Sequence, residues 1–272
     1  MYPPENLLLI AGSGKYPLLV VHSARAAGVK RIILVAFEGE TSPELSRLVD
    51  EMHTVRVGRL RHLLSVARKS GAYHAMAVGQ IAPKNLFDLH LDMRAFLLLA
   101  RLRKRNAETL FGAVADELAH IGVELLPATT FLNNHLANEG LLAGPKIKFP
   151  TMEDLQFGYQ IAKEISRLDI GQTVVVRKGT VLAVEAFEGT NASILRGGKL
   201  GKENATIVKV AKPNQDMRFD VPTIGVTTLE CASSVRIRSI GIEAHCTLLL
   251  EKDRLIEYAN LHSLSIYGLK AS

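Results

Sequence analysis

The sequence predicts an α/β protein with an N-terminal Rossmann-like parallel-sheet domain and a C-terminal α/β domain joined to it by a linker. Three observations lead to this prediction. Short apolar runs alternate with helical patterns in the first third of the chain, a stretch without periodicity follows, and strand and helix patterns then resume. Such alternation is typical of a parallel sheet covered by helices. The chain of 272 residues is long enough for two ordinary domains with cores of their own.

The first domain is expected over residues 1–131. Its strands are expected at short apolar runs, two of which end directly before glycine, and two of its helices are expected to stop at glycine. The expected elements are, in order, a strand at 7–11, a helix at 16–27, a strand at 31–36, a helix at 59–70, a strand at 74–78, helix from 89 to about 121 with a break near Asn106, and a strand at 123–126.

Residues 132–149 are expected to form the linker, because Asn, Gly and Pro occur there without periodicity. The second domain, at 150–272, is expected to begin with a helix at Thr151, which is followed by acidic residues in the first turn. Its further elements are expected to be strands at 173–177, 181–185, 207–211, 223–227 and 247–250, and helices at 190–196, 229–240 and 252–260.

The composition limits the classes of partner. The chain has 33 basic and 27 acidic side chains, and its net charge of +6 suits an anionic partner such as a phosphate, a nucleotide or the inner membrane leaflet. It has no tryptophan and 6% aromatic residues, so we expect no nucleic-acid partner bound by base stacking. The two cysteines lack CxxC spacing, the N-terminus lacks a signal-peptide pattern, and no apolar run reaches about 18 residues. We therefore expect a cytoplasmic protein with reduced thiols.

Gly12 and Gly14 follow the first expected strand and open a helix, as the first two glycines of a dinucleotide-binding fingerprint do. Pro17 stands where the third glycine would allow close packing of helix and strand, which disfavours a redox cofactor. Two interpretations remain open: a tight turn between strand and helix, or a loop whose amides contact a phosphate.

Asp220 lies among apolar residues in the stretch KPNQDMRFDVPTIG at 212–225. An acid in such surroundings is costly to bury unless a cation, a metal ion or several hydrogen-bond donors pair with it. Lys209, Lys212 and Arg218 add positive charge upstream. Such a combination is what a phosphate site with a divalent metal requires, although a paired structural acid explains Asp220 equally well in isolation.

Further polar residues of the second domain form a candidate phosphate site. Glu188-Gly189-Thr190 at the start of a helix would offer amides, a hydroxyl and the helix dipole to a phosphate. Carboxylates such as Glu185 are hard oxygen ligands that suit Mg²⁺ or Mn²⁺. Helix capping and surface salt bridges remain the alternative explanation. The candidate set comprises Glu185, Glu188, Thr190, Lys212, Asp220 and Thr223.

Residues 92–105, DMRAFLLLARLRKR, form an amphipathic basic pattern. Such a helix can lie on an anionic membrane surface. A helix that packs on the core and exposes a charged face fits the same pattern, and both interpretations remain open.

Several long motifs resemble one family, the LpxI-type UDP-2,3-diacylglucosamine pyrophosphatases of lipid A biosynthesis. They are DIGQTVVVRKGTVLAVEAFEGTNA at 169–192, KPNQDMRFDVPTIG at 212–225, the N-terminal LLLIAGSGKYP, and VGQI at 78–81. The similarity therefore extends over nearly the whole chain. The departures are mild: the apolar residues beside Asp220 differ from those of relatives, and the segment from Arg196 to Lys209 is short.

The resemblance implies a metal-dependent hydrolase with Mg²⁺ or Mn²⁺ that cleaves UDP-2,3-diacylglucosamine into UMP and 2,3-diacylglucosamine 1-phosphate (lipid X). It implies that the catalytic site lies in the C-terminal domain and that Asp220 is catalytic. We expect Asp220 either to be a metal ligand or to orient the attacking water, with Glu185 or Glu188 as a second metal ligand or base. The resemblance also implies peripheral association with the inner membrane and a homodimer. The implied substrate-binding residues are Gly12, Gly14, Gln80, Glu188, Gly189, Thr190, Lys212 and Thr223.

Two other functions are carried as alternatives. A nucleotide-dependent oxidoreductase would use Gly12 and Gly14, although Pro17 argues against it. A non-catalytic protein that binds a lipid or a nucleotide would use the same scaffold without releasing UMP.

Overall fold

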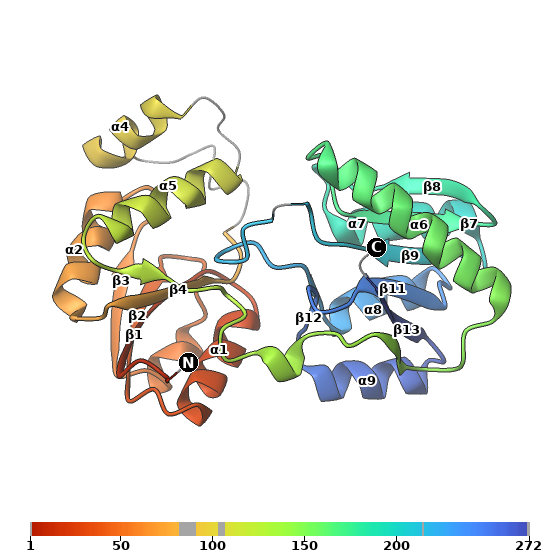
Figure 1. Ribbon diagram of the computed structural model, residues 1–272, viewed down its shortest axis with the longest axis horizontal. Coiled ribbons are helices and arrows are strands. Elements are labelled where there is room, and N and C mark those ends of the chain that lie inside the picture. The colour runs from red at the N-terminus through yellow and green to blue at the C-terminus, as the bar shows by residue number, and fades with distance from the viewer. Residues whose placement is uncertain (1, 82–90, 103–106, 214, 271–272) are drawn as a thin grey trace. The chain divides into compact units, whose positions relative to one another are not determined.

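The computed structural model describes residues 2–81, 91–102, 107–213 and 215–270 (Figure 1). It divides into two compact units. Unit 1 comprises Met1–Leu132 and Asp216–Asp220, and unit 2 comprises Asn133–Gln215 and Val221–Ser272. The chain therefore passes from one unit to the other three times, because a short piece of the C-terminal half belongs to unit 1.

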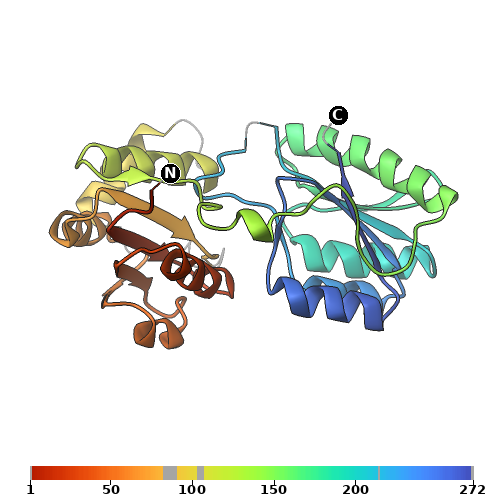
Figure 2. The same cartoon turned by 60° about the horizontal axis from the view of Figure 1, so that its bottom comes forward.

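Unit 1 is built on a parallel five-stranded sheet with the strand order β3-β2-β1-β4-β5, which confirms the predicted Rossmann-like domain. Figure 2 shows α1 on one side of this sheet and α5 on the other. The elements are β1 (Asn6–Ala11), α1 (Tyr16–Ala26), β2 (Arg31–Phe37), the 3-10 helix η1 (Pro43–Arg47), β3 (Glu51–Val55), α2 (Leu60–Ser70), β4 (His74–Val78), α4 (Met93–Arg101), α5 (Ala107–Ala119) and β5 (Glu124–Leu125).

The central strands match their predicted positions because parallel strands covered on both faces are continuously apolar. Leu7, Leu8 and Leu9 of β1 are fully buried, for example. β3 was not predicted, because it lies at the edge of the sheet and three of its five residues are exposed. The predicted helix break near Asn106 falls outside the described residues, and α4 and α5 lie on either side of it.

Unit 2 contains a mixed six-stranded sheet with the order β6-β13-β11-β9-β7-β8 and a separate two-stranded pair, β10 and β12. β9, β11 and β13 are parallel, whereas β7 is antiparallel to β9 and β6 is antiparallel to β13. The elements are β6 (Gly140–Ala143), α6 (Phe149–Arg167), β7 (Thr173–Arg177), β8 (Thr180–Val184), α7 (Thr190–Gly201), β9 (Thr206–Lys209), β10 (Thr223–Ile224), α8 (Val226–Ser234), β11 (Ser239–Glu243), β12 (Leu248–Leu249), α9 (Lys252–Leu261) and β13 (Ser265–Leu269).

The two faces of this sheet have separate cores. Val174, Val176 and Val208 face α6, whereas Val175 and Ile207 pack in a core with residues of α7, α8 and α9. Figure 2 shows α6 on one side of the sheet and α7 and α9 on the other. The alternation along β7 and β9 therefore decides which helix each side chain meets.

Several ranges of unit 2 differ from the sequence-based expectation. α7 continues beyond the expected end at residue 196 to Gly201, and β13 was not predicted. Residues 132–149, expected as a linker, contain the short 3-10 helix η2 (Asn133–His135) and the edge strand β6. The helix expected at 229–240 ends at Ser234, and Ser239–Glu243 forms the fully buried strand β11, because a short apolar run is ambiguous between helix and strand. The strand expected at 223–227 has two residues, because α8 begins directly after Gly225.

Candidate functional site

In unit 1 the loops that follow β1 and β4 lie against each other at the carboxyl edge of the sheet. The strand order places neighbouring crossovers on opposite sides of β1, and ligands of open α/β sheets bind at such a point. The Ser13 amide donates a hydrogen bond to the Gln80 carbonyl at 2.7 Å, and the Gln80 amide donates to the Ser13 carbonyl at 3.2 Å. The structure thus brings the predicted residues Gly12, Gly14 and Gln80 into one pair of loops.

Gly12 and Gly14 have different physical roles in these loops. A Cβ on Gly12 would collide with the Gln80 carbonyl oxygen and lie 2.8 Å from the carbonyl carbon, so Gly12 permits the close approach of the loops. Gly14 has a φ of +93° and no atom within 4 Å of such a Cβ, so it forms a left-handed turn in open space. α1 then begins at Tyr16 without a side-chain cap, which leaves first-turn amides available to an anion. The tight-turn interpretation explains Gly12, and phosphate contact at Gly14 stays a prediction.

Asp220 ends the segment Asp216–Asp220, which belongs to unit 1. The Ala128 amide donates to the Met217 carbonyl at 2.7 Å, just beyond β5. Phe219 packs on an aromatic ring of α5 with 5.6 Å between the ring centroids, and it joins the core beneath α2 and α5. The backbone that carries Asp220 is therefore fixed by unit 1, although most of its sequence neighbours belong to unit 2.

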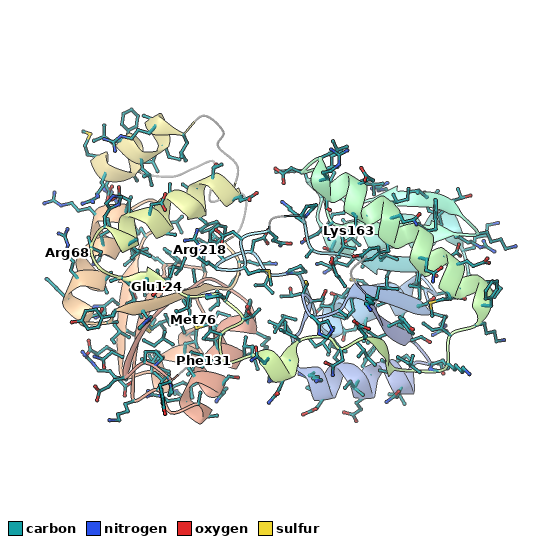
Figure 3. All side chains as sticks on the ribbon, viewed as in Figure 1. Arg68, Met76, Glu124, Phe131, Lys163 and Arg218 are labelled. Carbon is teal, nitrogen blue, oxygen red and sulfur yellow. The ribbon has the colours of Figure 1, made fainter. Side chains whose placement is uncertain are left out.

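The Asp216 side chain closes this segment into a turn. Arg218 (labelled in Figure 3) forms an ion pair with the Asp216 carboxylate at 2.6 Å between Nη2 and Oδ2. The hydrogen bond from Arg218 lowers the pKa of Asp216 from its ordinary value. The amides of Phe219 and Asp220 both donate to the Asp216 carbonyl, at 3.2 and 3.0 Å. Of the cations that precede Asp220 in the sequence, Arg218 is thus engaged with Asp216.

Unit 2 gathers polar side chains at one edge of its sheet, on the face covered by α7. Thr190, the first residue of α7, donates its hydroxyl to Glu185 Oε1 at 2.7 Å, and Lys209 Nζ donates to the same hydroxyl oxygen at 3.2 Å. The Gln172 amide donates to Glu185 Oε2 at 3.3 Å. Glu185 and Lys209 are 8% and 7% exposed, so their charges lie close together in a largely buried setting. The predicted pair Glu185 and Thr190 is therefore in direct contact, and Lys209 completes the cluster.

Two buried hydroxyl groups belong to the same face. Thr173 lies opposite Lys209 in the pairing of β7 with β9, and Ser193 lies in the first turn of α7. Both residues are fully buried, and within the described residues neither hydroxyl has a hydrogen-bond partner. Gly189, with a φ of +83°, precedes α7 and provides no side-chain cap. The start of α7 therefore offers amides of the kind that a phosphate group binds, whereas the Thr173 and Ser193 hydroxyls are enclosed by protein.

A second polar cluster lies on the opposite face of this edge, beneath α6, and the sequence did not indicate it. Glu243, at the end of β11, is 3% exposed. Its carboxylate accepts hydrogen bonds from Lys163 Nζ at 3.1 Å, from the Tyr159 hydroxyl at 3.2 Å and from the Ala211 amide at 2.8 Å. Figure 3 labels Lys163 on α6. The missed signal was the pairing of Tyr159 with Lys163 four residues later, because that spacing places both on the buried face of a helix.

The remaining predicted residues have local partners. Glu188 forms an ion pair with Arg196 at 2.6 Å, and this contact lowers the pKa of Glu188. Lys212 Nζ forms an ion pair with Asp169 Oδ1 at 2.6 Å. Thr223 lies in β10, which pairs with β12. For Glu188 the alternative of a surface salt bridge accounts for the contact with Arg196. Lys212 also has an ion pair, and it follows Lys209 and Ala211, which contact the two polar clusters, in the sequence.

The predicted metal ligands are distributed over both units, with Asp220 in unit 1 and Glu185 in unit 2. Within the described residues, no group of three or more His, Cys, Asp and Glu side chains could hold a metal ion. Mg²⁺ is usually held by one or two carboxylates together with substrate phosphates and water. Among the described residues, Asp220 and Glu185 therefore each offer a carboxylate of the kind that binds Mg²⁺ together with phosphate and water.

The fold and these clusters define a two-unit α/β protein with glycine-containing loops and polar clusters at strand ends. The chain matches the family models described as LpxI N-terminal domain over residues 6–135 and LpxI C-terminal domain over residues 138–267, and it belongs to the LpxI family. A protein of Caulobacter vibrioides named UDP-2,3-diacylglucosamine pyrophosphatase LpxI is 29% identical over 276 residues, which cover 97% of this chain and 98% of that protein.

A solved structure described as "Crystal structure of gox2253" covers 97% of this chain and 90% of its own, with 8% identity and a TM-score of 0.33. This likeness is too low to carry an argument. The family membership therefore rests on the two domain models and on the Caulobacter relative.

Proposed function

We propose that the protein hydrolyses the diphosphate of UDP-2,3-diacylglucosamine, giving UMP and 2,3-diacylglucosamine 1-phosphate for lipid A biosynthesis. The observation that carries the proposal is the similarity to the Caulobacter pyrophosphatase over 97% of the chain. Both family domains are present, so the similarity includes the segment with Asp220 as well as the start of α7.

Asp220 is proposed to be the catalytic carboxylate, either as a ligand of Mg²⁺ or Mn²⁺ or as the group that orients the attacking water. The hydrogen bonds of the Asp216–Asp220 turn support this role, because they hold its backbone in one conformation. The bound ion would neutralise the diphosphate and stabilise charge on the leaving UMP. Glu185, with Glu188 as the alternative, is the candidate for a second metal ligand or base, and each oxygen of Glu185 keeps a lone pair for an ion beside the hydrogen bonds from Thr190 and Gln172.

Phosphate-binding groups are proposed in each unit by itself. In unit 1 the Gly14 loop with Gln80 supplies amides, and in unit 2 the start of α7 with Gly189 and Thr190 supplies amides and a hydroxyl. Lys209, beside Thr190 at 3.2 Å, supplies a cation close to the start of α7. Lys212, Glu188 and Thr223 remain proposed substrate-binding residues.

The test is the release of UMP from UDP-2,3-diacylglucosamine, followed by chromatography and mass spectrometry with Mg²⁺, with Mn²⁺ and with EDTA. Asp220→Asn should lower kcat on the order of a thousandfold, because a carboxylate that holds the ion or the water contributes several kcal/mol to the transition state. Asp253→Asn is the matched control, since Asp253 is an exposed acid on α9. Reaction in ¹⁸O-labelled water would show that the label enters the glucosamine-side phosphate.

The outcomes separate the alternatives. Wild-type protein that binds the lipid but releases no UMP would be the non-catalytic binding protein. Near-normal, EDTA-sensitive turnover by Asp220→Asn would show that another residue has the catalytic role. The oxidoreductase requires binding of NAD(P), which calorimetry measures, and Pro17 in the first turn of α1 supports its exclusion.

We also propose a cytoplasmic protein that associates peripherally with the inner membrane, because the acyl chains of the proposed substrate lie in a bilayer. A homodimer is proposed on the family resemblance. Light scattering of the purified protein measures its oligomeric state.

A further inference from the structure

The helix α4 exposes an apolar face to solvent. Met93, Phe96 and Leu97 are 73%, 57% and 49% exposed, and Ala100 is also exposed. These positions follow the i, i+3, i+4, i+7 spacing, so they form one stripe along the helix. The opposite face holds the buried Ala95 and packs towards α2 and α5. α4 therefore has apolar residues on two faces. The face with Ala95 packs on the core, and the face with the stripe is exposed.

An open pocket of about 650 Å³ lies beside the start of α4. Its lining includes Arg59, Arg61 and His62 at the start of α2, and Asp92 at the start of α4. Asp92 joins the two helices, because its carboxylate accepts hydrogen bonds from the amides of Arg61 at 2.7 Å and Ala95 at 2.9 Å. The pocket, whose three arginines outnumber its acids Glu38 and Asp92, thus lies at the start of the helix that carries the apolar stripe.

Among the described side chains, two arginines of this surface lack an acidic partner, whereas Arg94 of α4 pairs with Glu117. Within the described part of the chain, the side chains of Arg59, Arg61 and His62 have no hydrogen-bond or ion-pair partner. The sequences of α2 and α4 contain no acidic residue. Arg56, also in the pocket lining, is paired with Glu38 at 2.6 Å. The surface therefore combines free guanidinium groups with exposed large apolar side chains.

We infer that this surface, the α2–α4 face, docks on an anionic phospholipid bilayer. The apolar stripe of α4 enters the interface between headgroups and acyl chains, and a lipid phosphate binds Arg59 and Arg61 in the pocket. The inference extends the proposed function, on which its biological reason rests, because a lipid-linked substrate must be taken from a membrane. Among the described residues, no helix has the length and apolarity to cross a bilayer.

A second copy of the chain fits this surface poorly. A two-fold interface places the same patch on both partners, so it would bring two sets of these arginines into one interface. The neighbouring exposed cations Arg68 and Lys69 on α2 and Arg101 on α4 would add to that repulsion. The charge of the patch complements phosphate headgroups instead.

A tryptophan probe tests insertion directly, because the chain has no tryptophan of its own. In Phe96→Trp the indole emission should shift to shorter wavelength when vesicles of phosphatidylethanolamine and phosphatidylglycerol are added, and brominated lipids should quench it. Phe149→Trp is the matched control, since Phe149 is 75% exposed and lies in unit 2. Emission from Phe96→Trp that stays unchanged with these vesicles would overturn the inference.

Binding variants separate the two parts of the surface. Phe96→Ser/Leu97→Ser should bind the anionic vesicles at least about tenfold more weakly, whereas Phe149→Ser/Leu261→Ser should bind like wild type. Arg59→Gln/Arg61→Gln should lose about tenfold or more and show weaker salt dependence, in contrast to Lys146→Gln/Lys199→Gln. Circular dichroism verifies that each variant is folded.

Three results would contradict the inference: equal binding by all these variants, equal binding of wild type to phosphatidylcholine vesicles, or a dimer that Phe96→Ser/Leu97→Ser dissociates. The last would assign the face to a second copy. UMP release from detergent-dispersed substrate is measured in parallel. If the proposed function is wrong, wild type releases no UMP but still binds the vesicles. The two proposals can therefore fail separately.

Discussion

Glu243 and Lys163 form an ion pair in which the acid is almost fully buried and the lysine is 28% exposed. Burying such a pair is not necessarily stabilising, but removing one partner leaves a charge in a poor environment. Tyr159 and the Ala211 amide would continue to donate to the carboxylate, which limits the cost. The pair also anchors the chain directly after β9, where Lys209 and Lys212 lie.

Lys163→Met is expected to lower the free energy of unfolding by about 2 kcal/mol, because the Glu243 carboxylate loses its cation. Urea denaturation at neutral pH measures the change. Lys199→Met is the control, since Lys199 is exposed on α7, and it should change stability by less than about 0.5 kcal/mol. Equal effects of the two substitutions would show that the ion pair makes no contribution.

At the level of residues, the sequence indicated part of the polar edge of unit 2. Glu185 and Thr190 are five positions apart and flank a single turn, so their contact follows from local sequence. Glu243 is 80 positions from Lys163, and their contact depends on the placement of β11 beneath α6. A contact between residues so far apart in the sequence can be predicted only when the strand order of the sheet is known.

Among the elements, the ends of β1 and β4 illustrate how closely two loops of a parallel sheet can approach. Gly12 faces the Gln80 backbone, and a Cβ on Gly79 would lie 2.7 Å from the Ser13 carbonyl oxygen. Neither loop has space for a side chain at these positions. The lack of a side chain at both glycines thus lets the ends of β1 and β4 lie close together. The same spacing positions the first turn of α1.

Gly12→Ala should destabilise the protein by about 1–3 kcal/mol, because the Gln80 backbone must move to admit a Cβ. Gly112→Ala, in α5 with no atom within 4 Å of the new Cβ, should be neutral or stabilising by about 0.5–1 kcal/mol. Thermal unfolding of both variants provides the comparison. An unchanged Tm for Gly12→Ala would mean that the loops have room to separate.

Helices and strands were predicted accurately where a glycine marks the end of the element. β1 and β4 are apolar runs that end directly before glycine, and their predicted ranges are close to the observed ones. β11 and β13 lack such clear boundaries, so β11 was partly assigned to a helix and β13 was not predicted. Both are fixed by parallel pairing across the sheet, which local pattern does not reveal.

For the whole molecule, the segment Asp216–Asp220 matters because it returns the chain to unit 1 for five residues. Its attachments there are the Ala128 hydrogen bond and the packing of Phe219 on Phe111. The ion pair of Asp216 with Arg218 maintains the turn between these contacts. The sequence drew attention to Asp220 but contained no sign that it belongs with the N-terminal half.

Asp216→Asn should lower the hydrogen-exchange protection of the Ala128 amide, because the turn that presents the Met217 carbonyl loses its ion pair. The same contact gives a pH dependence. The folded-state pKa of Asp216 lies below its ordinary value of 3.8, so its contribution to stability is present above that value and is lost as pH falls through the folded pKa.

Wild-type protection at Ala128 should therefore be constant near neutral pH and decrease only below about pH 4. Exchange measured by NMR or mass spectrometry checks both expectations. Glu203→Gln removes an exposed ion pair with Arg236 in unit 2 and should leave Ala128 unaffected. Protection in Asp216→Asn equal to that of wild type would show that Phe219 alone secures the segment.

The chain crosses between the two units three times, and this affects hybrids made from two members of the family. An exchange made at residues 135–138, between the two family models, would transplant Phe219 and Met217 with the second half while Phe111 and Ala128 stayed behind. The donated half would carry five residues that must fit a host surface with which they did not evolve. We therefore expect substitutions at positions 111 and 219 to be correlated among natural members, and functional hybrids to require that both positions come from one parent.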